Sequence, residues 1–360
     1  MNALISVRAQ RVGQVNWNWL TENKQWGNVF CITELFRHRV DKRLNAIVFS
    51  ANGNLAIAMK SRCGLILDPR GEVLETVCGE NKMSYVSYSN GRFGFITESG
   101  QVIITDEGGK VIKNLKIDRF YAKVIGMGPD GFVACNDSCG FFDFDGKMKW
   151  TVNAEAVLSN PVYYGGYWYI PEYGAGVHIV KDKRYGTEKD ALYHEDENIV
   201  NTVPIKHVHY VDVCDEYLVA TSGDILYPTN HEIHLFNIVN PVKPREMWKI
   251  DETKKQDVMG MFGRAVFSPR CRYIAVIFNE VVNVDILGGD LYEMYEGRVK
   301  IFSIRGKLMH TLKFEEQLEL SSLDWKGRRL AVGTNVLGTN TLYEFEIEKI
   351  PTPFPIILYP

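Results

Sequence analysis

The stretch AVFSPRCRYIAVIFNE, residues 265–280, decides the fold. A short apolar run meets a Ser-Pro turn at residues 268–271, and a run of alternating β-forming residues follows. One such phrase predicts only a β-hairpin. Its repetition along the chain would instead predict a repeat architecture, so we looked for further copies.

The phrase is repeated along most of the chain. Each copy has an apolar β-run, a polar turn and a second alternating run, and further copies cover residues 47–77, 87–115, 126–152, 163–188 and 322–335. A third run ends most units at a turn, and the first four such turns recur about every 38 residues, at 68–71, 106–109, 143–146 and 181–186. Asn-Gly, Asp-Gly and Gly-Gly in these turns supply the positive φ that tight hairpins require.

Four short antiparallel strands in a unit of this length are typical of a β-propeller blade. The third strands are predicted at 63–68, 101–106, 139–143, 176–182, 231–238, 298–304 and 341–347. The predicted fold class is therefore all-β, a single seven-bladed propeller of four-stranded antiparallel blades.

Two units also resemble a known family. VFSPRCRYIAVIF with GRVKIFSIRGKLMHTL (297–312), and LSSLDWKGRRLAVGTN with TLYEFEI (341–347), are similar to WD-repeat units, although the Gly-His and Trp-Asp signatures are missing. The same pattern is equally similar to quinoprotein-like propellers. The resemblance covers about residues 44–350 and implies the architecture without a particular function.

The N-terminal segment is expected to close the ring. Residues 28–36, NVFCITELF, are predicted to form a strand that completes the seventh blade, which otherwise ends after its third strand. Closure would remove exposed sheet edges. We therefore expect one domain over 1–360, with the closing strand in 1–43, the blades in 44–350 and a tail at 351–360.

Composition indicates a soluble cytoplasmic protein. A net charge of −3 argues against direct nucleic-acid binding, and no stretch approaches the about 20 apolar residues of a membrane span. Seven cysteines, an odd and scattered set, suggest reduced thiols that pack as small core residues.

The candidate metal sites are weak, and neither a metal nor a cofactor is predicted. His207 and His209 belong to a first strand and His231 and His234 to a third, roughly 9.5 Å away, which is too wide for one zinc ion. Cys135 and Cys139 lack a second cysteine pair. Asp143 and Asp145 start a calcium-like loop that lacks its later carboxylates, so a hairpin turn is the better interpretation.

Longer connections between strands are more informative. Five connections are extended from the fourth blade onward: 187–203, 222–230, 251–263, 279–297 and 335–340. We expect all five on one face of the ring. Three of them, 187–203, 251–263 and 279–297, hold 13 carboxylates against three lysines, a local net charge near −10.

These observations favour a non-enzymatic protein-interaction platform whose acidic upper face over blades four to seven binds a protein partner with a basic surface. The predicted partner-binding residues are Glu195, Asp196, Asp257, Glu280, Asp285, Asp290, Tyr292, Met294 and Tyr295. The alternative is a small-molecule or enzymatic site in the central funnel, where the inner strands offer few carboxylates beyond Asp212 and Asp324.

Overall fold

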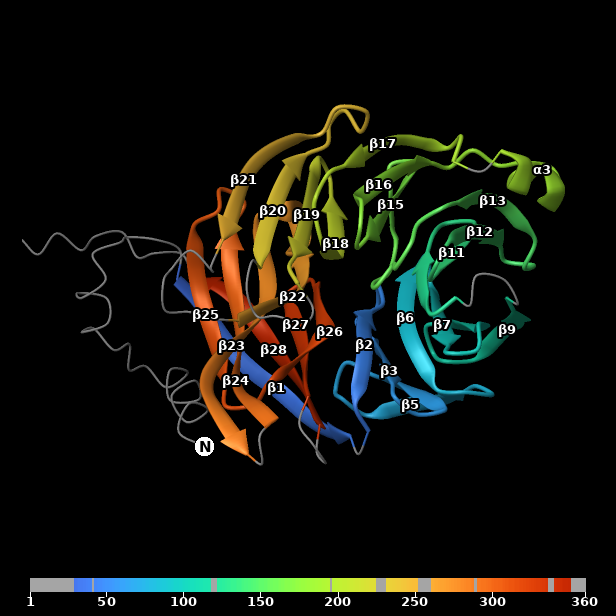
Figure 1. The fold of residues 1–360 in the computed structure, drawn as a ribbon. Helices are drawn as coiled ribbons and strands as arrows, with labels where there is room; N and C mark the ends of the chain where they lie inside the picture. Colours follow the sequence, from blue (N-terminus) through green and yellow to red (C-terminus); the bar gives the residue numbers. More distant parts are fainter. Residues whose placement is uncertain are drawn as a thin grey trace, which may run out of the picture.

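The chain forms a closed ring of seven sheets. The computed structural model describes residues 29–350, except residues 41, 118–121, 195, 225–230, 252–259, 288–289 and 336–339. Within these residues there are seven antiparallel sheets of four strands each, arranged around a central axis (Figure 1). The predicted seven-bladed propeller is confirmed.

Each of the first four blades runs from an inner strand at the axis to an outer strand at the rim. The first blade consists of β2 (Leu44–Phe49), β3 (Leu55–Met59), β4 (Cys63–Leu67) and β5 (Val73–Cys78). The second consists of β6 (Met83–Ser89), β7 (Arg92–Thr97), β8 (Gln101–Asp106) and β9 (Val111–Lys116). The third consists of β10 (Val124–Met127), β11 (Gly131–Cys135), β12 (Cys139–Asp143) and β13 (Met148–Val152). The fourth consists of β14 (Val162–Tyr164), β15 (Tyr167–Glu172), β16 (Gly176–Lys181) and β17 (Ile199–Val203).

The last three blades follow the same order, except that the outer strand of the seventh comes from the N-terminal part of the chain. The fifth blade consists of β18 (Val208–Cys214), β19 (Tyr217–Ser222), β20 (Glu232–Asn237) and β21 (Arg245–Asp251). The sixth consists of β22 (Gly260–Phe267), β23 (Tyr273–Leu287), β24 (Asp290–Ser303) and β25 (Leu308–Phe314). The seventh consists of β26 (Leu318–Lys326), β27 (Arg329–Thr334), β28 (Asn340–Ile350) and β1 (Val29–Val40).

Burial explains why the third strands could be found from the sequence. The observed third strands of all seven blades overlap their predicted ranges. The third strand β8 is buried at every residue except its last, whereas the outer strands β5 and β9 are mostly exposed. Strands covered on both faces by neighbouring blades are nearly continuous apolar runs, which makes them conspicuous.

The turns after the third strands of the first three blades share one motif, Asp-x-x-Gly. The carboxylates of Asp68, Asp106 and Asp143 each accept hydrogen bonds from two backbone N–H groups of the turn, at 2.8–3.1 Å. The glycine three positions later has φ between +83° and +96°, a conformation that other residues rarely adopt. The hairpin-turn interpretation of Asp143 is confirmed.

Aromatic side chains fill the space between blades. Phe141 of the third blade stacks on Trp150 with ring centroids 5.6 Å apart, and its ring lies 6.0 Å from that of Trp168 in the fourth blade. Trp168 and Tyr169 are fully buried, while Tyr164 is exposed. The aromatic cluster at 163–170 is therefore mainly core.

Strand β1 closes the ring. It pairs antiparallel with β28 from Val29↔Ile350 to Val40↔Asn340, with a register shift between Glu34 and Phe36. Phe30 and Ile32 are buried in a core cluster formed with side chains of the sixth and seventh blades. The predicted closure by an N-terminal strand is confirmed, and the strand continues to residue 40.

Antiparallel strands send successive connections to opposite faces of the ring. We define the upper face as the one that carries the second-to-third-strand connections and the blade-to-blade connections. The connections at 222–230, 251–263, 279–297 and 335–340 belong to it. Residues 187–203 instead link the third and fourth strands of the fourth blade, so the prediction that they share this face is wrong.

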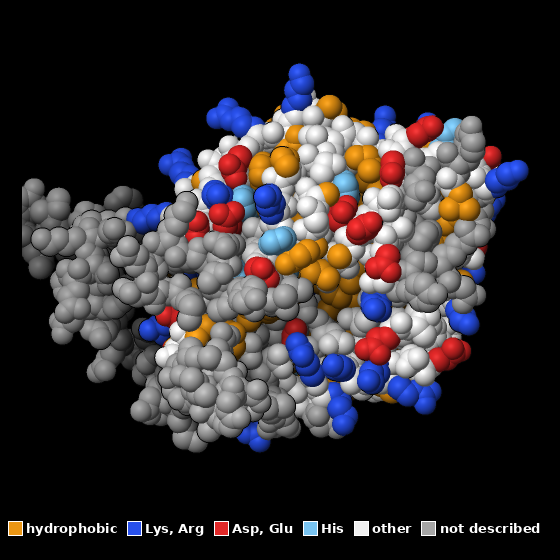
Figure 2. Space-filling model, viewed as in Figure 1, with side chains coloured by type: hydrophobic (Ala, Val, Ile, Leu, Met, Phe, Trp, Pro, Cys, Tyr) orange, Lys and Arg blue, Asp and Glu red, His pale blue; other side chains and the backbone are white. Residues whose placement is uncertain are grey.

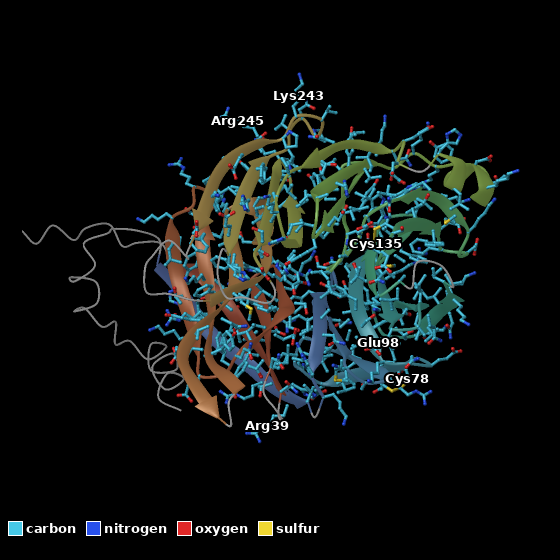
Figure 3. All side chains as sticks on the ribbon, in the orientation of Figure 1. Arg39, Cys78, Glu98, Cys135, Lys243 and Arg245 are labelled. Carbon is cyan, nitrogen blue, oxygen red and sulfur yellow. A yellow bond between two sulfur atoms is a disulfide. The ribbon has the colours of Figure 1, made fainter. Side chains whose placement is uncertain are left out.

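Six of the seven cysteines form disulfides, which contradicts the predicted reduced thiols. Cys63–Cys78 and Cys135–Cys139 each join residues that face each other directly in neighbouring strands, with Cα atoms 4.0 and 4.2 Å apart. Cys214–Cys271 joins turns of the fifth and sixth blades on the face opposite the upper face. Figure 3 labels Cys78 and Cys135. The prediction of reduced thiols was wrong because the sequence gives the spacing of the cysteines but not the strand register that places two of them opposite each other.

The closing strand provides a test of ring stability. Ile32→Asp should lower the free energy of unfolding by about 3 kcal/mol or more, because it places a carboxylate in the core between blades. The matched control is Leu35→Asp in the same strand, since Leu35 is 43% exposed against 5% for Ile32. Urea unfolding would measure both variants. Equal stabilities would show that β1 does not hold the ring.

The disulfides provide a second test. Alkylation of the denatured, unreduced protein, trapped directly from its own cells, should detect one reactive thiol, and a reduced control should detect seven. Thiols of cytoplasmic proteins are normally reduced. Seven reactive thiols in the trapped sample would therefore support the predicted cytoplasmic location and contradict the three disulfides.

Candidate functional site

The connection at 279–297 is a strand pair and not a loop. Strands β23 and β24 continue their antiparallel register as far as Leu287↔Asp290. The neighbouring strands stop earlier, since β22 pairs only up to Glu280 and β25 only from Gly297. In the described part of the chain, residues 281–296 therefore pair in register only with each other. We call these residues the arm; its strands lie at the lower left of Figure 1.

The base of the arm is fixed to the seventh blade. The amide of Asn279, a fully buried side chain, donates to the carbonyl of Leu318 at 2.8 Å and accepts from its N–H at 2.9 Å. The N–H of Gly297 donates to the carbonyl of Glu316 at 3.0 Å. The side-chain amide of Asn279 thus makes the two backbone hydrogen bonds that a paired strand residue would make, and it links the sixth blade to the seventh. This contact fixes the direction in which the arm leaves the ring.

Charges at the base of the arm are partly paired. Glu280 forms an ion pair with Arg298, which also lies 3.7 Å from Glu296. Arg298 is one residue beyond the acidic segment that the sequence singled out, so a cation outside that segment offsets the charge of Glu280. Tyr295 is half-buried and pairs in register with Val281.

The other predicted residues of the arm are placed by backbone register only. Asp285 pairs with Tyr292, Met294 pairs with Asn283, and Asp290 begins β24. The side chains of Asp285, Asp290, Tyr292 and Met294 lie outside the described part, as do residues Glu195 and Asp257 altogether.

The acidic segment 187–203 is built into the ring. It forms a short helix, α3 (Glu188–Tyr193), capped by Thr187, and then the outer strand β17. Ala191 is buried and its carbonyl accepts from Thr151 of the third blade at 3.2 Å, while Asp196 accepts from the N–H of Asn153 at 2.7 Å. Asp196 therefore supports the link between two blades.

No helix in the described ranges is long and apolar enough to cross a membrane.

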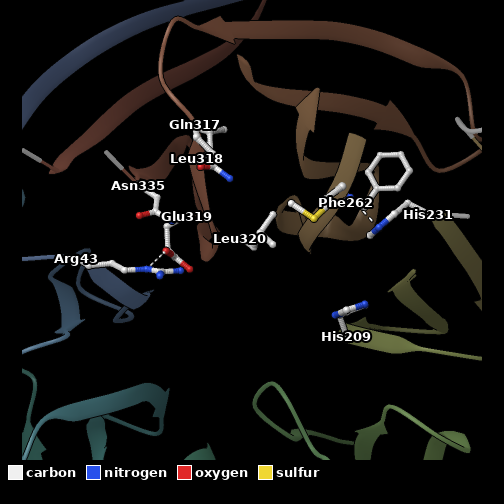
Figure 4. A pocket seen from close by; sticks show the side chains of 10 residues that line it. Arg43, His209, His231, Phe262, Gln317, Leu318, Glu319, Leu320 and Asn335 are labelled. Carbon is white, nitrogen blue, oxygen red and sulfur yellow. Dashed lines mark hydrogen bonds and ion pairs between the residues drawn. The ribbon is translucent and has the colours of Figure 1, made fainter. Parts of the chain in front are cut away.

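A pocket of about 190 Å³ opens at the upper-face end of the central axis. Its residues start the inner strands of the first, fifth, sixth and seventh blades or flank strands that end on this face. Figure 4 shows Arg43, Gln317, Glu319 and Asn335 on one side of the opening and His209, His231 and Phe262 on the other.

Hydrogen bonds fix the polar side chains of this pocket. Arg43 Nε donates to Glu319 Oε2 at 2.8 Å, and the Glu319 side chain is only 8% exposed. His231 Nδ1 accepts from the N–H of Phe262 at 3.3 Å, so its Nε2–H donates to the carbonyl of Asp224 at 3.1 Å. His209 Nε2 donates to the carbonyl of Gly223 at 2.6 Å.

Deeper in the channel, carboxylates link the inner strands of neighbouring blades. Asp212 accepts from the N–H of Phe267 at 2.8 Å, and Asp324 accepts from the N–H of Phe49 at 2.7 Å. Ser87 makes an equivalent bond between the second and third blades, accepting from the N–H of Met127 at 3.1 Å. The two acids that the sequence offered as funnel candidates are therefore engaged in blade-to-blade contacts.

A buried arginine occupies the middle of the channel. Arg264 is 7% exposed and donates to the carbonyl of Ile47 at 3.1 Å, while its Nε has no hydrogen-bond partner among the described residues. Asp212 and Asp324 act on its charge electrostatically. A charged residue inside the apolar inner strand GMFGRAVF was the signal that sequence analysis missed.

Burial shifts the proton affinities of channel groups. It raises the pKa of Asp212 to about 6 and lowers the pKa of His209 to about 4. Burial also raises the pKa of Tyr210 and of Glu319. His209 is therefore neutral near pH 7, and because its Nε2 carries the proton, its Nδ1 is a hydrogen-bond acceptor.

The candidate metal ligands of the sequence are arranged differently from a metal centre. His234 lies between Glu246 at 2.9 Å and Glu232 at 3.1 Å. In the described ranges one group, Cys214, Asp215 and Cys271, brings three possible ligand atoms within 4.8 Å of one another, and its two sulfurs are joined as a disulfide.

The face drawn in Figure 2 shows no single acidic region among its coloured residues. The face drawn in Figure 2 carries Lys and Arg as well as Asp and Glu side chains among its coloured residues, with hydrophobic side chains near the centre. Most of the carboxylates predicted for the upper face belong to the arm or to segments outside the described part, so this acidic excess stays a prediction.

Comparisons with known structures agree on the fold. The Neurospora crassa Pan2 WD40 domain matches with a TM-score of 0.62 at 11% identity, covering 90% of this chain and 98% of that one. The WD40 propeller of Doa1 matches with a TM-score of 0.60 at 9% identity, covering 87% and 96%. BamB from Moraxella catarrhalis matches with a TM-score of 0.54 at 14% identity, covering 87% and 97%.

These similarities agree with a β-propeller fold, and the sheets of this chain show that its propeller has seven blades. No protein-family model matches the chain, and no sequence among the curated proteins matches it. At identities of 9–14% these comparisons show a shared fold and do not indicate a function. The function has to be argued from the residues of the site.

The channel groups predict an unusual pH dependence. A raised pKa at Asp212 contributes stability that is present below about pH 4 and is lost as the pH rises through about 6. A lowered pKa at His209 contributes stability that is present above about pH 6.5 and is lost as the pH falls through about 4. Between pH 4 and 6 the contribution of Asp212 to the free energy of unfolding therefore falls with rising pH, while the contribution of His209 rises.

Without the carboxylate of Asp212, the pH dependence that His209 gives to the free energy of unfolding should become visible. From pH 4 to pH 6 the free energy of unfolding of Asp212→Asn should rise by about 2–3 kcal/mol relative to that of the unchanged protein. Urea titrations at several pH values would measure it, with Asp137→Asn at an exposed turn as the control. Parallel pH profiles for Asp212→Asn and the unchanged protein would contradict the shift.

Proposed function

We propose that this propeller is a non-enzymatic protein-interaction platform and that its upper face, with the arm, is the partner-binding surface. The arm carries this proposal, because a two-stranded extension adds nothing to the ring that encloses the core. Its backbone leaves the blade after the last pairings with β22 and β25, and its base is held by Asn279.

The form of the arm suits recognition of another chain. Among the described strands it has no neighbour on either edge, so the backbone groups along its edges are available for pairing. Its segment 281–296 contains Asp285, Asp290, Glu293 and Glu296 and no Lys or Arg. Opposite charge on a partner would raise the rate of association, so we propose a partner with a basic surface.

The fold and the channel support the same proposal. WD40-type propellers commonly serve as protein-interaction scaffolds, and this chain has their architecture. Asp212 and Asp324 at the axis accept backbone hydrogen bonds from neighbouring blades. This structural role accounts for both carboxylates without a catalytic function. These two observations favour a platform over an enzyme.

Aromatic residues of the arm provide the test. Tyr292→Ala together with Tyr295→Ala should weaken binding of a partner, purified on the unchanged protein, by about 2 kcal/mol or more. Alternate residues of a strand point to opposite faces, so the two single substitutions test the two faces of the arm separately. Titration calorimetry would measure the dissociation constants.

Tyr164→Ala is the matched control, because Tyr164 is an exposed tyrosine beside a turn on the opposite face. Asp285→Asn with Asp290→Asn should mainly slow association and flatten its dependence on salt. Glu280 is left unchanged, since its removal would free Arg298. Normal binding by the double tyrosine variant would place the interface elsewhere.

A further inference from the structure

The axial pocket contains hydrogen-bonding groups that have no partner within the described part of the chain. Beyond the bond from Arg43 Nε to Glu319, no partner is recorded in the described part of the chain for the two terminal nitrogens of Arg43. The side-chain amides of Gln317 and Asn335 and the Nδ1 atom of His209 are likewise without a described partner. Arg43 is exposed, Gln317 and Asn335 are half-buried, and all three line the pocket together with His209, so these groups can meet a ligand there.

The two sides of the pocket differ in what they offer. Arg43 has only N–H donors, and the amides of Gln317 and Asn335 beside it can both donate and accept. Across the opening, His209 offers an acceptor at Nδ1, because its Nε2–H is engaged by Gly223. A complementary ligand therefore has an acceptor at one end and an O–H or N–H donor at the other.

Charge selects a neutral ligand. The guanidinium of Arg43 is already paired with Glu319, a carboxylate that is almost completely buried. An anionic ligand would bring a second negative charge close to Glu319, and the described residues that line the pocket include no unpaired cation to balance it. A neutral acceptor can use the remaining donors of Arg43 without that repulsion.

Size and apolar surface narrow the class further. A volume of about 190 Å³ equals roughly six water molecules, enough for a compact molecule of about ten non-hydrogen atoms. Met261, Leu318 and Leu320 also line the pocket and provide apolar surface, and Leu320 lies between the two polar sides in Figure 4. A flat ring suits this surface, since both aliphatic side chains and a thioether pack well against aromatic faces.

We propose that the axial pocket binds a small neutral aromatic molecule that places a carbonyl acceptor at Arg43 and a hydroxyl or N–H donor at His209. This site is independent of the arm, so it can fail or succeed without affecting the proposed platform function.

Matched probes test the proposal on the full-length protein. 4-Hydroxybenzamide has the required acceptor, donor and ring, and 4-hydroxybenzoate has the same shape with a negative charge. Ligand-detected NMR titration should show binding of the amide at least about tenfold tighter than that of the acid. Benzamide, which lacks the hydroxyl for His209, should bind about fivefold more weakly than 4-hydroxybenzamide.

Removing the buried charge should reverse the preference. In Glu319→Gln the charge of Arg43 is unbalanced, so 4-hydroxybenzoate should bind at least about tenfold more tightly than to the unchanged protein. His310→Gln in the outer strand β25 is the control and should leave both affinities unchanged. If Glu319→Gln does not fold, Gln317→Ala replaces it and should weaken binding of the amide about fivefold.

Two results would overturn the proposal. One is the absence of saturable binding of 4-hydroxybenzamide to the unchanged protein up to its solubility limit. The other is binding of 4-hydroxybenzoate that equals or exceeds that of the amide, because charge exclusion by Glu319 is the basis of the predicted selectivity.

Discussion

The pairing of β1 with β28 is the contact on which the ring depends. It joins segments about 300 residues apart in the sequence, and it supplies the fourth strand of a blade that otherwise presents the open edge of β28. Such an edge would pair with other chains. Phe30 and Ile32 from β1 also complete a core cluster with side chains of the sixth and seventh blades. The last blade is therefore complete only when the two ends of the described chain have met.

The axis is held by polar contacts as well as by apolar packing. Asp212 and Asp324, both half-buried, each accept a backbone N–H from the next blade and act electrostatically on the buried Arg264. Burial disfavours the ionised carboxylate of Asp212 and so raises its pKa. A buried cation and two carboxylates that satisfy backbone donors are consistent with a structural role for the middle of the channel.

The two ends of the axis have different characters. The opposite face carries the short first-to-second-strand turns, and one disulfide, Cys214–Cys271, joins two of them. The upper face carries the arm and the axial pocket. Asn279 and Leu318 connect these two features, since Asn279 fixes the base of the arm to Leu318, which also lines the pocket. The upper face is where both proposed activities are found.

The sequence by itself determined the blades, their number, the Asp-x-x-Gly turns and the closing strand, because these depend on local alternation and on residues that permit positive φ. It did not reveal that 279–297 is a paired arm, that Arg298 neutralises Glu280, or that 187–203 lies on the other face. The disulfides and the pocket formed by Arg43, His209 and Glu319 were also hidden. These features depend on register and on which strands meet at the axis, and only the closed ring brings residues from distant blades within hydrogen-bonding distance.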